Sequence, residues 1–156
     1  MSTFQYKGQG LRSVGAYQVS GVPWVTGSST LGQNKVHMVQ FPYVTKSFTV
    51  INTNTTADYD IRVHFNSGSS AQTDGGLTMP GEIGEGDIDD TDDVIANFHY
   101  ITVPAGNSSI TFDVKCKEVF ISQNAAAADF TYQVFAELTN ISTGSMYHLT
   151  GSGITV

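Results

Sequence analysis

A chain of 156 residues, 40% of them apolar, is one domain by size and can bury a core without staples, which excludes the small disulfide-dependent scaffolds. Only 13% of the residues are charged, roughly half the usual share. The chain has a net charge of −7, and its seven lysines and arginines are scattered, which excludes a basic surface that binds the phosphates of a nucleic acid. The lone cysteine, Cys116, excludes an internal disulfide and a cysteine-rich zinc site. So weakly charged a surface suits a protein packed against neighbours.

The N-terminal sequence, MSTFQYKGQG, lacks the apolar segment of a secretory signal peptide. No stretch approaches the ~18 apolar residues of a membrane span. We therefore expect a protein made in a cytoplasm without a signal peptide and without a membrane partner. The scattered cations also argue against direct nucleic-acid binding.

The first predicted element is the segment SVGAYQVSGVPWVTGSS, residues 13–29. Glycines and Pro23 interrupt its aromatic and aliphatic residues and break any regular element that they could begin. Exposed apolar groups of this kind mark interaction surfaces, so we predict that residues 1–34 form an extended N-terminal arm. The predicted contacts with a neighbouring subunit are Tyr17, Val22, Trp24 and Val25. Two alternatives stay open: the arm covers its own domain, or it is disordered.

From residue 35 onward, apolar and polar residues alternate in short runs, which is typical of half-buried antiparallel strands. The predicted strands cover residues 35–41, 46–53, 59–65, 94–103, 109–115, 118–122 and 129–138, with one or two more in 145–156. The alternation directs these side chains toward the core: Phe48, Val50, Ile61, Val63, Phe65, Ile110, Phe112, Val114, Tyr132 and Val134. No window shows a convincing helical repeat.

About eight strands in one domain must each bury one face, which implies two packed sheets or a closed barrel. Of the two, we expect the sandwich. A weak internal echo relates FTVINTNTTADYDIRVHF, from Phe48, to VFISQNAAAADFTYQVFA, from Val119. Each segment has the pattern of a strand, a polar turn and a second strand. A jelly roll, which is built from two Greek keys, would contain two such similar hairpins, although chance similarity explains the echo equally well. The prediction is an all-β, single-domain antiparallel sandwich of jelly-roll type over residues 35–156, preceded by the N-terminal arm.

The longest interruption of the strand pattern covers residues 66–93, and its second half carries seven of the chain's fourteen acidic residues. Asp87, Asp89, Asp90 and Asp92 alternate as the oxygen ligands of a hard cation do, which gives a calcium hypothesis. The run lacks the central glycine and the distal glutamate of an EF-hand loop. A solvated acidic loop and a contact with a basic patch of another subunit are the alternatives.

Catalytic motifs are scarce in this sequence. His37, His64, His99 and His148 show no metal-binding spacing, and each lies in a strand-like pattern, where a hydrogen-bonded core or polar-face histidine is the default. No nucleophile elbow, P-loop or dinucleotide fingerprint occurs. We therefore expect a non-enzymatic protein without a cofactor.

The glycine-rich N-terminal segment, the low charge, the abundant threonine and asparagine and the short strands resemble small β-sandwich structural proteins of icosahedral virions and large phages. These are penton, decoration and cement proteins with jelly-roll-type folds. GAYQVSGVPWVTGSS and FTVINTNTTADYDIRVHF carry the resemblance most clearly. The resemblance implies a virion location after synthesis in the host cytoplasm, a homo-oligomer, contacts with other virion structural proteins, and no catalytic residues.

Two other functions stay open. A phage tail, collar or fibre component would share the same pattern, and particle symmetry would separate it from a capsid subunit. A carbohydrate-binding module would also be a β-sandwich and would need coplanar aromatic side chains. The aromatic residues available for such a site are Trp24, Tyr43, Tyr59, Tyr100 and Tyr147.

Overall fold

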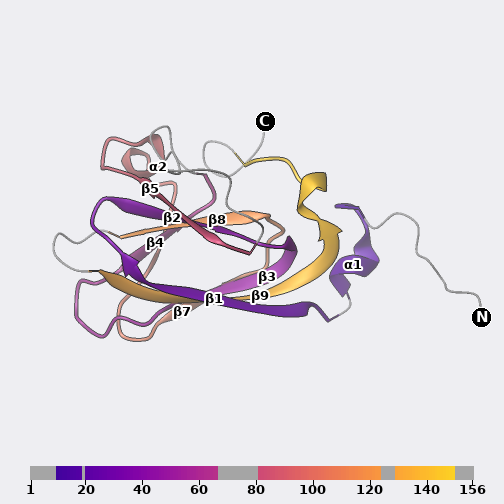
Figure 1. Ribbon diagram of the computed structural model, residues 1–156, viewed down its shortest axis with the longest axis horizontal. Coiled ribbons are helices and arrows are strands. Elements are labelled where there is room, and N and C mark those ends of the chain that lie inside the picture. Colours follow the sequence, from indigo (N-terminus) through magenta and orange to yellow (C-terminus); the bar gives the residue numbers. More distant parts are fainter. Residues whose placement is uncertain (1–9, 19, 67–80, 124–128, 150–156) are drawn as a thin grey trace, which may run out of the picture.

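The computed structural model describes residues 10–18, 20–66, 81–123 and 129–149. In this part, nine antiparallel strands form two stacked sheets (Figure 1). The four-stranded sheet has the order β1 (Val22–Leu31), β9 (Phe130–Ser142), β3 (Tyr43–Asn52) and β7 (Ser109–Phe112). The five-stranded sheet has the order β5 (Ile83–Asp87), β2 (Lys35–Gln40), β8 (Glu118–Gln123), β4 (Ile61–His64) and β6 (Ile101–Val103).

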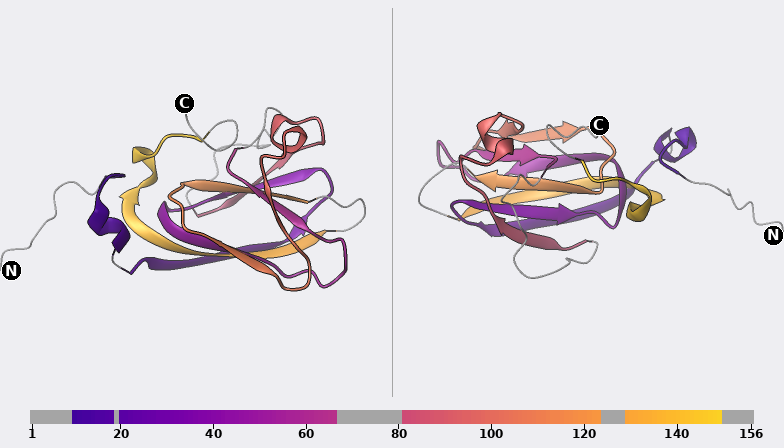
Figure 2. Two further views of the ribbon diagram at one scale, coloured as in Figure 1. Left: turned by 180° about the vertical axis from the view of Figure 1, so that it is seen from behind. Right: turned by 90° about the horizontal axis from the view of Figure 1, so that it is seen from above.

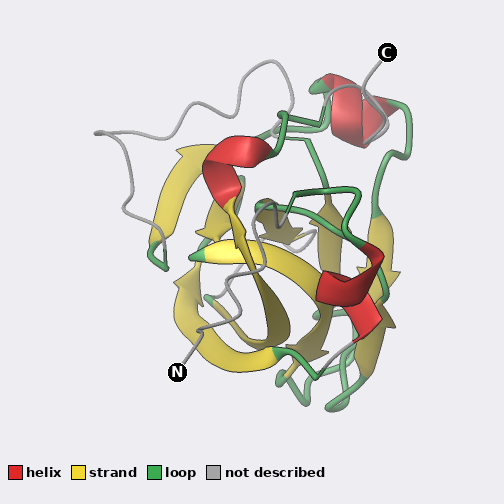
Figure 3. Cartoon of the chain, turned by 90° about the vertical axis from the view of Figure 1, so that its right-hand side faces the viewer, coloured by secondary structure: helices red, strands yellow, loops and turns green. Residues whose placement is uncertain are grey.

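In the described part of the chain, three short helices lie outside the sheets. They are α1 (Val14–Gln18), α2 (Asp93–Ala96) and the 3₁₀ helix η1 (Thr143–Ser145). α1 and η1 lie at one end of the sandwich, the end that faces the viewer in Figure 3. α2 lies on the outer side of the five-stranded sheet, where it covers part of that face (Figure 2).

The strand order is that of a jelly roll. Apart from β5, the first four strands of the chain and the last four each contribute two strands to each sheet. Strands from the two halves alternate across both sheets, as in two interlocked Greek keys. The predicted all-β sandwich of jelly-roll type is confirmed, with β5 as an added strand at one edge of the five-stranded sheet.

The core lies between the inner faces of the two sheets. The residues predicted to face inward from β3, β4 and β9 are all buried, and Phe48 stacks on Phe112 of β7 with ring centroids 4.9 Å apart. Phe65 and Ile110 are partly buried against the same core. The prediction for Val114 is wrong, because β7 ends at Phe112 and leaves Val114 38% exposed.

A second apolar cluster covers the outer face of the five-stranded sheet. Residues 94–103, predicted as one strand, instead form the end of α2, a turn and the short strand β6. Val94 and Ile95 are neighbours in sequence and are both buried against Phe120 of β8, whereas a strand would turn one of them to solvent. The helix ends at Asn97, and Phe98 follows with a φ of 58°.

The structure corrects the predicted N-terminal arm. Residues 22–31 form β1, an edge strand that pairs with β9 along most of its length, so the domain boundary predicted at residue 35 is wrong. Gly27 does not interrupt this strand, because a Cβ there would lie only 2.7 Å from the Tyr132 carbonyl oxygen, an approach that glycine alone permits. Residues 1–9 of the predicted arm lie outside the described residues.

Two other predicted segments also differ. Residues 81–93 of the predicted 66–93 loop contain β5, which pairs with β2, and the start of α2; residues 67–80 lie outside the described residues. At the C-terminus, β9 continues to Ser142, η1 follows, and residues 146–149 form neither helix nor strand. The strand prediction for 150–156 lies outside the described residues.

Phe48 tests the assignment of the core. Replacing Phe48 by alanine removes a buried ring that contacts three other aromatic rings, so the free energy of unfolding should fall by about 3–5 kcal/mol. Val114→Ala, at the partly exposed position, should change it by less than about 0.5 kcal/mol. Urea denaturation followed by circular dichroism measures both values. Similar losses at the two positions would contradict this assignment.

Candidate functional site

The four residues predicted as subunit contacts divide between the inside and the outside of the domain. Trp24 packs edge-on against Phe41, with ring centroids 5.4 Å apart, and Tyr17 of α1 packs against the main core. Val25 points outward and is 67% exposed, whereas Val22, on the same face of β1 as Trp24 but at the first residue of the strand, is 52% exposed. The segment therefore covers its own domain through Trp24 and Tyr17, and it leaves Val22 and Val25 accessible to a partner.

One row of side chains across the outer face of the four-stranded sheet carries no charge. The row crosses β1, β9, β3 and β7 and contains Val25, Phe135, Thr49 and Thr111. Phe135 is 37% exposed, and the hydroxyls of Thr49 and Thr111 share a hydrogen bond of 2.8 Å. This neutral row begins at the exposed Val25 of β1 and crosses the whole outer face of the four-stranded sheet.

Two of the carboxylates in the calcium hypothesis are paired with cations. Asp87 accepts a hydrogen bond from Lys35 Nζ at 2.6 Å. Asp90 Oδ1 lies 3.7 Å from Arg62 Nη1. Both cations come from strands of the five-stranded sheet, so these pairs attach the acidic segment to the sheet.

The other two carboxylates shape the turn before α2. Asp92 is buried and accepts a hydrogen bond from the Asp89 backbone N–H at 2.8 Å, and Asp89 accepts one from the Thr91 N–H at 2.8 Å. The hydrogen bonds from Thr91 lower the pKa of Asp89. Asp87, Asp89 and Asp92 line one open pocket with Asn34 and Ile88. Among the described residues, however, no three histidine, cysteine or acidic side chains are placed to hold a metal ion.

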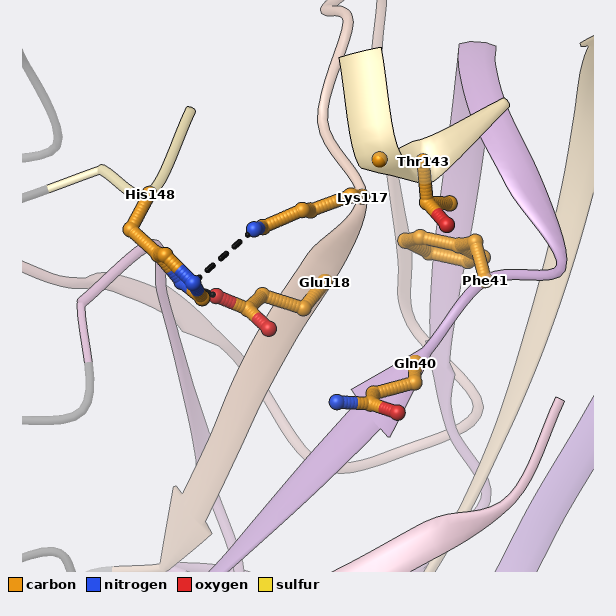
Figure 4. Close-up of a pocket in the computed structure, with 7 residues that line it drawn as sticks. Gln40, Phe41, Lys117, Glu118, Thr143 and His148 are labelled. Atoms are coloured by element: carbon orange, nitrogen blue, oxygen red, sulfur yellow. Dashed lines mark hydrogen bonds and ion pairs between the residues drawn. The ribbon is translucent and has the colours of Figure 1, made fainter. Parts of the chain in front are cut away.

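A small pocket of about 180 Å³ opens beside the turn between β2 and β3 (Figure 4). It is lined by Gln40, Phe41, Lys117, Glu118, Thr143, Gly144 and His148. The His148 Nδ1–H donates to Glu118 Oε1 at 3.0 Å, and His148 Nε2 accepts from Lys117 Nζ at 3.0 Å. Ligand pockets usually measure ~300–1,000 Å³, so this pocket is small for a ligand, and three of its polar side chains already bond one another.

Two buried histidines make hydrogen bonds of the kind that catalytic sites use. The His64 Nδ1–H donates to the Asn66 carbonyl at 2.7 Å, and His64 Nε2 accepts from the Ser122 hydroxyl at 3.2 Å. His64 and Ser122 are both fully buried, so the hydroxyl is out of reach of a substrate. His37 Nδ1 accepts from the Tyr132 hydroxyl at 2.9 Å, which joins the two sheets. Both histidines therefore act in packing.

Burial favours the neutral form of both histidines. Desolvation lowers the pKa of His64 from 6.5 to about 4, although the hydrogen bond to Asn66 opposes the shift. Desolvation also lowers the pKa of His37, against the hydrogen bond and charge of Glu85, which raise it. Both side chains are consequently neutral in the folded protein at neutral pH.

The aromatic residues considered for carbohydrate binding do not form one platform. Trp24 packs inward, Tyr59 stacks on a core phenylalanine, and Tyr100 lies under a guanidinium group. Tyr43 and Tyr147 are exposed, but no ring contact joins them within the described ranges. The coplanar pair or triplet that sugar stacking needs is therefore not assembled by these residues.

Sequence reasoning missed β1 and the buried His64–Ser122 pair. In β1 the half-buried positions are Trp24, Thr26 and Ser28. Their alternation is a strand signal, but two of the three inward residues are polar, so hydropathy does not reveal it. The partners of His64 come from an adjacent strand and a backbone carbonyl, which sequence spacing cannot indicate.

The fold and these surfaces are what the molecule offers for inferring a function. No family model matches the chain, and no match is found among curated proteins or solved structures. None of the helices in the described ranges is long and apolar enough to cross a membrane.

His64 predicts a loss of stability in acid. Between pH 6.5 and about 4, only the unfolded chain takes up the proton. The free energy of unfolding should therefore fall as the pH decreases through this window, by about 3 kcal/mol in all from this group. Urea denaturation at successive pH values should show that His64→Gln, although less stable at neutral pH, has a flatter dependence. His148→Gln, at an exposed site, should keep the original slope, and parallel curves for His64→Gln and the unchanged chain would contradict the assignment.

Calcium should not stabilise the protein through the four aspartates. Their carboxylates are already engaged by cations and backbone N–H groups, and a ligand stabilises only a folded state that binds it. Thermal unfolding in millimolar calcium and in EDTA should give the same melting temperature. A rise in calcium that Asp89→Asn abolishes would restore the calcium hypothesis.

Proposed function

We propose that the chain is a non-enzymatic structural subunit of a virus or phage particle: a capsid, penton, decoration or cement protein. The jelly-roll strand order carries the proposal, because viral capsid domains are one of the main uses of this fold. Lectins use the fold too, so the surface has to decide between them.

The surface favours assembly over ligand binding. The pocket beside the β2–β3 turn is small, and among the described residues no ring contact joins the exposed Tyr43 and Tyr147. By contrast, Val25 and Phe135 are exposed side by side on β1 and β9. Exposed apolar residues grouped in this way usually mark contacts with other proteins.

The distribution of charge supports the same conclusion. The chain has a net charge of −7, so two copies repel one another at a distance. The neutral row from Val25 to Thr111 offers a face on which copies pack without opposing like charges. A subunit held among neighbours also has less need of the charge that keeps free proteins soluble.

Self-association of the purified full-length chain tests the proposal. Mass photometry and negative-stain microscopy should show symmetric oligomers or closed particles. Phe135→Asp places a charge in the neutral row and should weaken the assembly, whereas Tyr147→Asp, at an exposed aromatic residue outside the row, should not. A chain that stays monomeric at every concentration would contradict the proposal.

A further inference from the structure

We propose that residues 1–9 of a second copy add a fifth strand to the four-stranded sheet, along the free edge of β1. The inference rests on the proposed function, since it names the contact through which copies associate. Three features carry it: the long, uncharged edge of β1, the exposed carboxylates of β5, and the position of Leu11 and α1.

Among the four sheet edges of the described chain, that of β1 is the longest, and its only defences are Pro23 and the register shift after Ser28. β6 and β7 have only three and four residues, and β5 carries Glu85 and Asp87. Short edges and edge charges are the usual defences against a further strand. β1 has ten residues, VPWVTGSSTL, and none of them is charged. Such an edge accepts an extended segment through main-chain hydrogen bonds.

Backbone groups of β1 face this edge at alternate residues. Proline has no N–H to donate to a ladder, so we infer that the backbone of Pro23, which is opposite Glu137 in the register, faces away from β9. Val25 and Gly27, two and four residues later, direct their N–H and C=O groups to the same side. The pairing with β9 keeps its register as far as Ser28, so residues 23–27 offer a regular edge.

The five-stranded sheet extends beyond the four-stranded sheet on this side. Glu85 and Asp87 of β5 lie opposite His37 and Lys35 of β2, so their side chains share the inward face of His37. His37 is covered by Tyr132 of β9, but the Glu85 and Asp87 side chains are 50% and 66% exposed. A strand added beside β1 would lie over β5 and cover these carboxylates (Figure 2).

The occupant of this position has to supply positive charge. Lys35 Nζ lies 2.6 Å from Asp87 and 3.8 Å from Glu85, so the single positive charge of Lys35 is shared between two negatively charged carboxylates. His37, the other basic side chain near Glu85, has its pKa lowered by burial and is neutral. A segment that carries a lysine would neutralise the remaining negative charge of Glu85 and Asp87.

The first nine residues, MSTFQYKGQ, have this chemistry. They carry Lys7 and the α-amino group and no acidic residue. Phe4 and Tyr6 alternate with Gln5 and Lys7, which is a strand pattern. With Lys7 toward β5, alternation places Phe4 and Tyr6 on the outer face, next to the exposed Val25.

The position of α1 makes a second copy the source of this strand. Lys115, beyond the end of β7, donates from Nζ to the Leu11 carbonyl at 2.9 Å. The next residue of this connection, Cys116, accepts from the Thr45 N–H, so Leu11 is held near the start of β3, two strand spacings or about 10 Å from β1. The chain then passes through α1 and reaches Gly21 beside Glu137 of β9. A segment that starts near β3 would have to turn back past α1 to reach the β1 edge of its own copy, so we assign the added strand to a neighbour.

Sedimentation velocity and Trp24 fluorescence of full-length variants test the inference. Trp24 is the sole tryptophan and lies on β1, half-buried, so its emission should move to shorter wavelength as copies associate. Lys7→Glu should raise the dissociation constant at least about tenfold and remove the wavelength shift over the same concentrations. Arg12→Glu makes the same charge change at an exposed residue outside the proposed strand and should behave as the unchanged chain. Adding Asp87→Lys to Lys7→Glu should restore association.

The outcomes separate this contact from the proposed function. Association that Lys7→Glu and Arg12→Glu weaken equally, or that neither weakens, overturns the fifth strand and leaves the assembly role standing. A chain that is monomeric at every concentration overturns both. A Trp24 emission at short wavelength that does not change with concentration means that the edge is covered within one copy, which also overturns the inference.

Discussion

The burial of alternate side chains of β9 between the two sheets is the interaction on which the rest of the structure depends. Tyr132, Val134 and Ala136 are buried on this strand, which pairs with β1 on one side and with β3 on the other. Tyr132 also donates to His37 of the opposite sheet. Because stabilisation grows with the apolar area removed from water, β9 both contributes to the core and holds its sheet together.

Buried polar groups fix how the two sheets are joined. The Asn52 amide at the end of β3 donates to the carbonyls of Tyr59 and Val103, and the second of these belongs to the other sheet. Asn54 continues the network to the backbone of Thr131. A buried amide without these partners would cost free energy, so the network favours one alignment of the sheets. The neutral outer row and the free edge of β1 are therefore held on a well-defined framework.

The alternation in β3, β4 and β9 was sufficient to predict the fold class and most of the core, because one buried face per strand leaves a period of two in the sequence. It was insufficient for β1, because the inward residues Thr26 and Ser28 are polar and the period of two does not appear in the hydropathy. The calcium hypothesis depended on local spacing, which cannot reveal that Lys35, distant in sequence, binds Asp87. The exposure of the β5 carboxylates likewise could not be predicted from the sequence, because it depends on how the two sheets are stacked.

Amide hydrogen exchange along β1 tests most directly whether this edge is where copies meet. Trp24 and Thr26 lie in the ladder with β9, and their N–H groups should be protected at every concentration. The N–H groups of Val25 and Gly27 face the free edge and should exchange rapidly in dilute protein and become protected in the assembled state. Protection of all four amides in dilute monomer, or no gain at Val25 and Gly27 on assembly, would contradict the account.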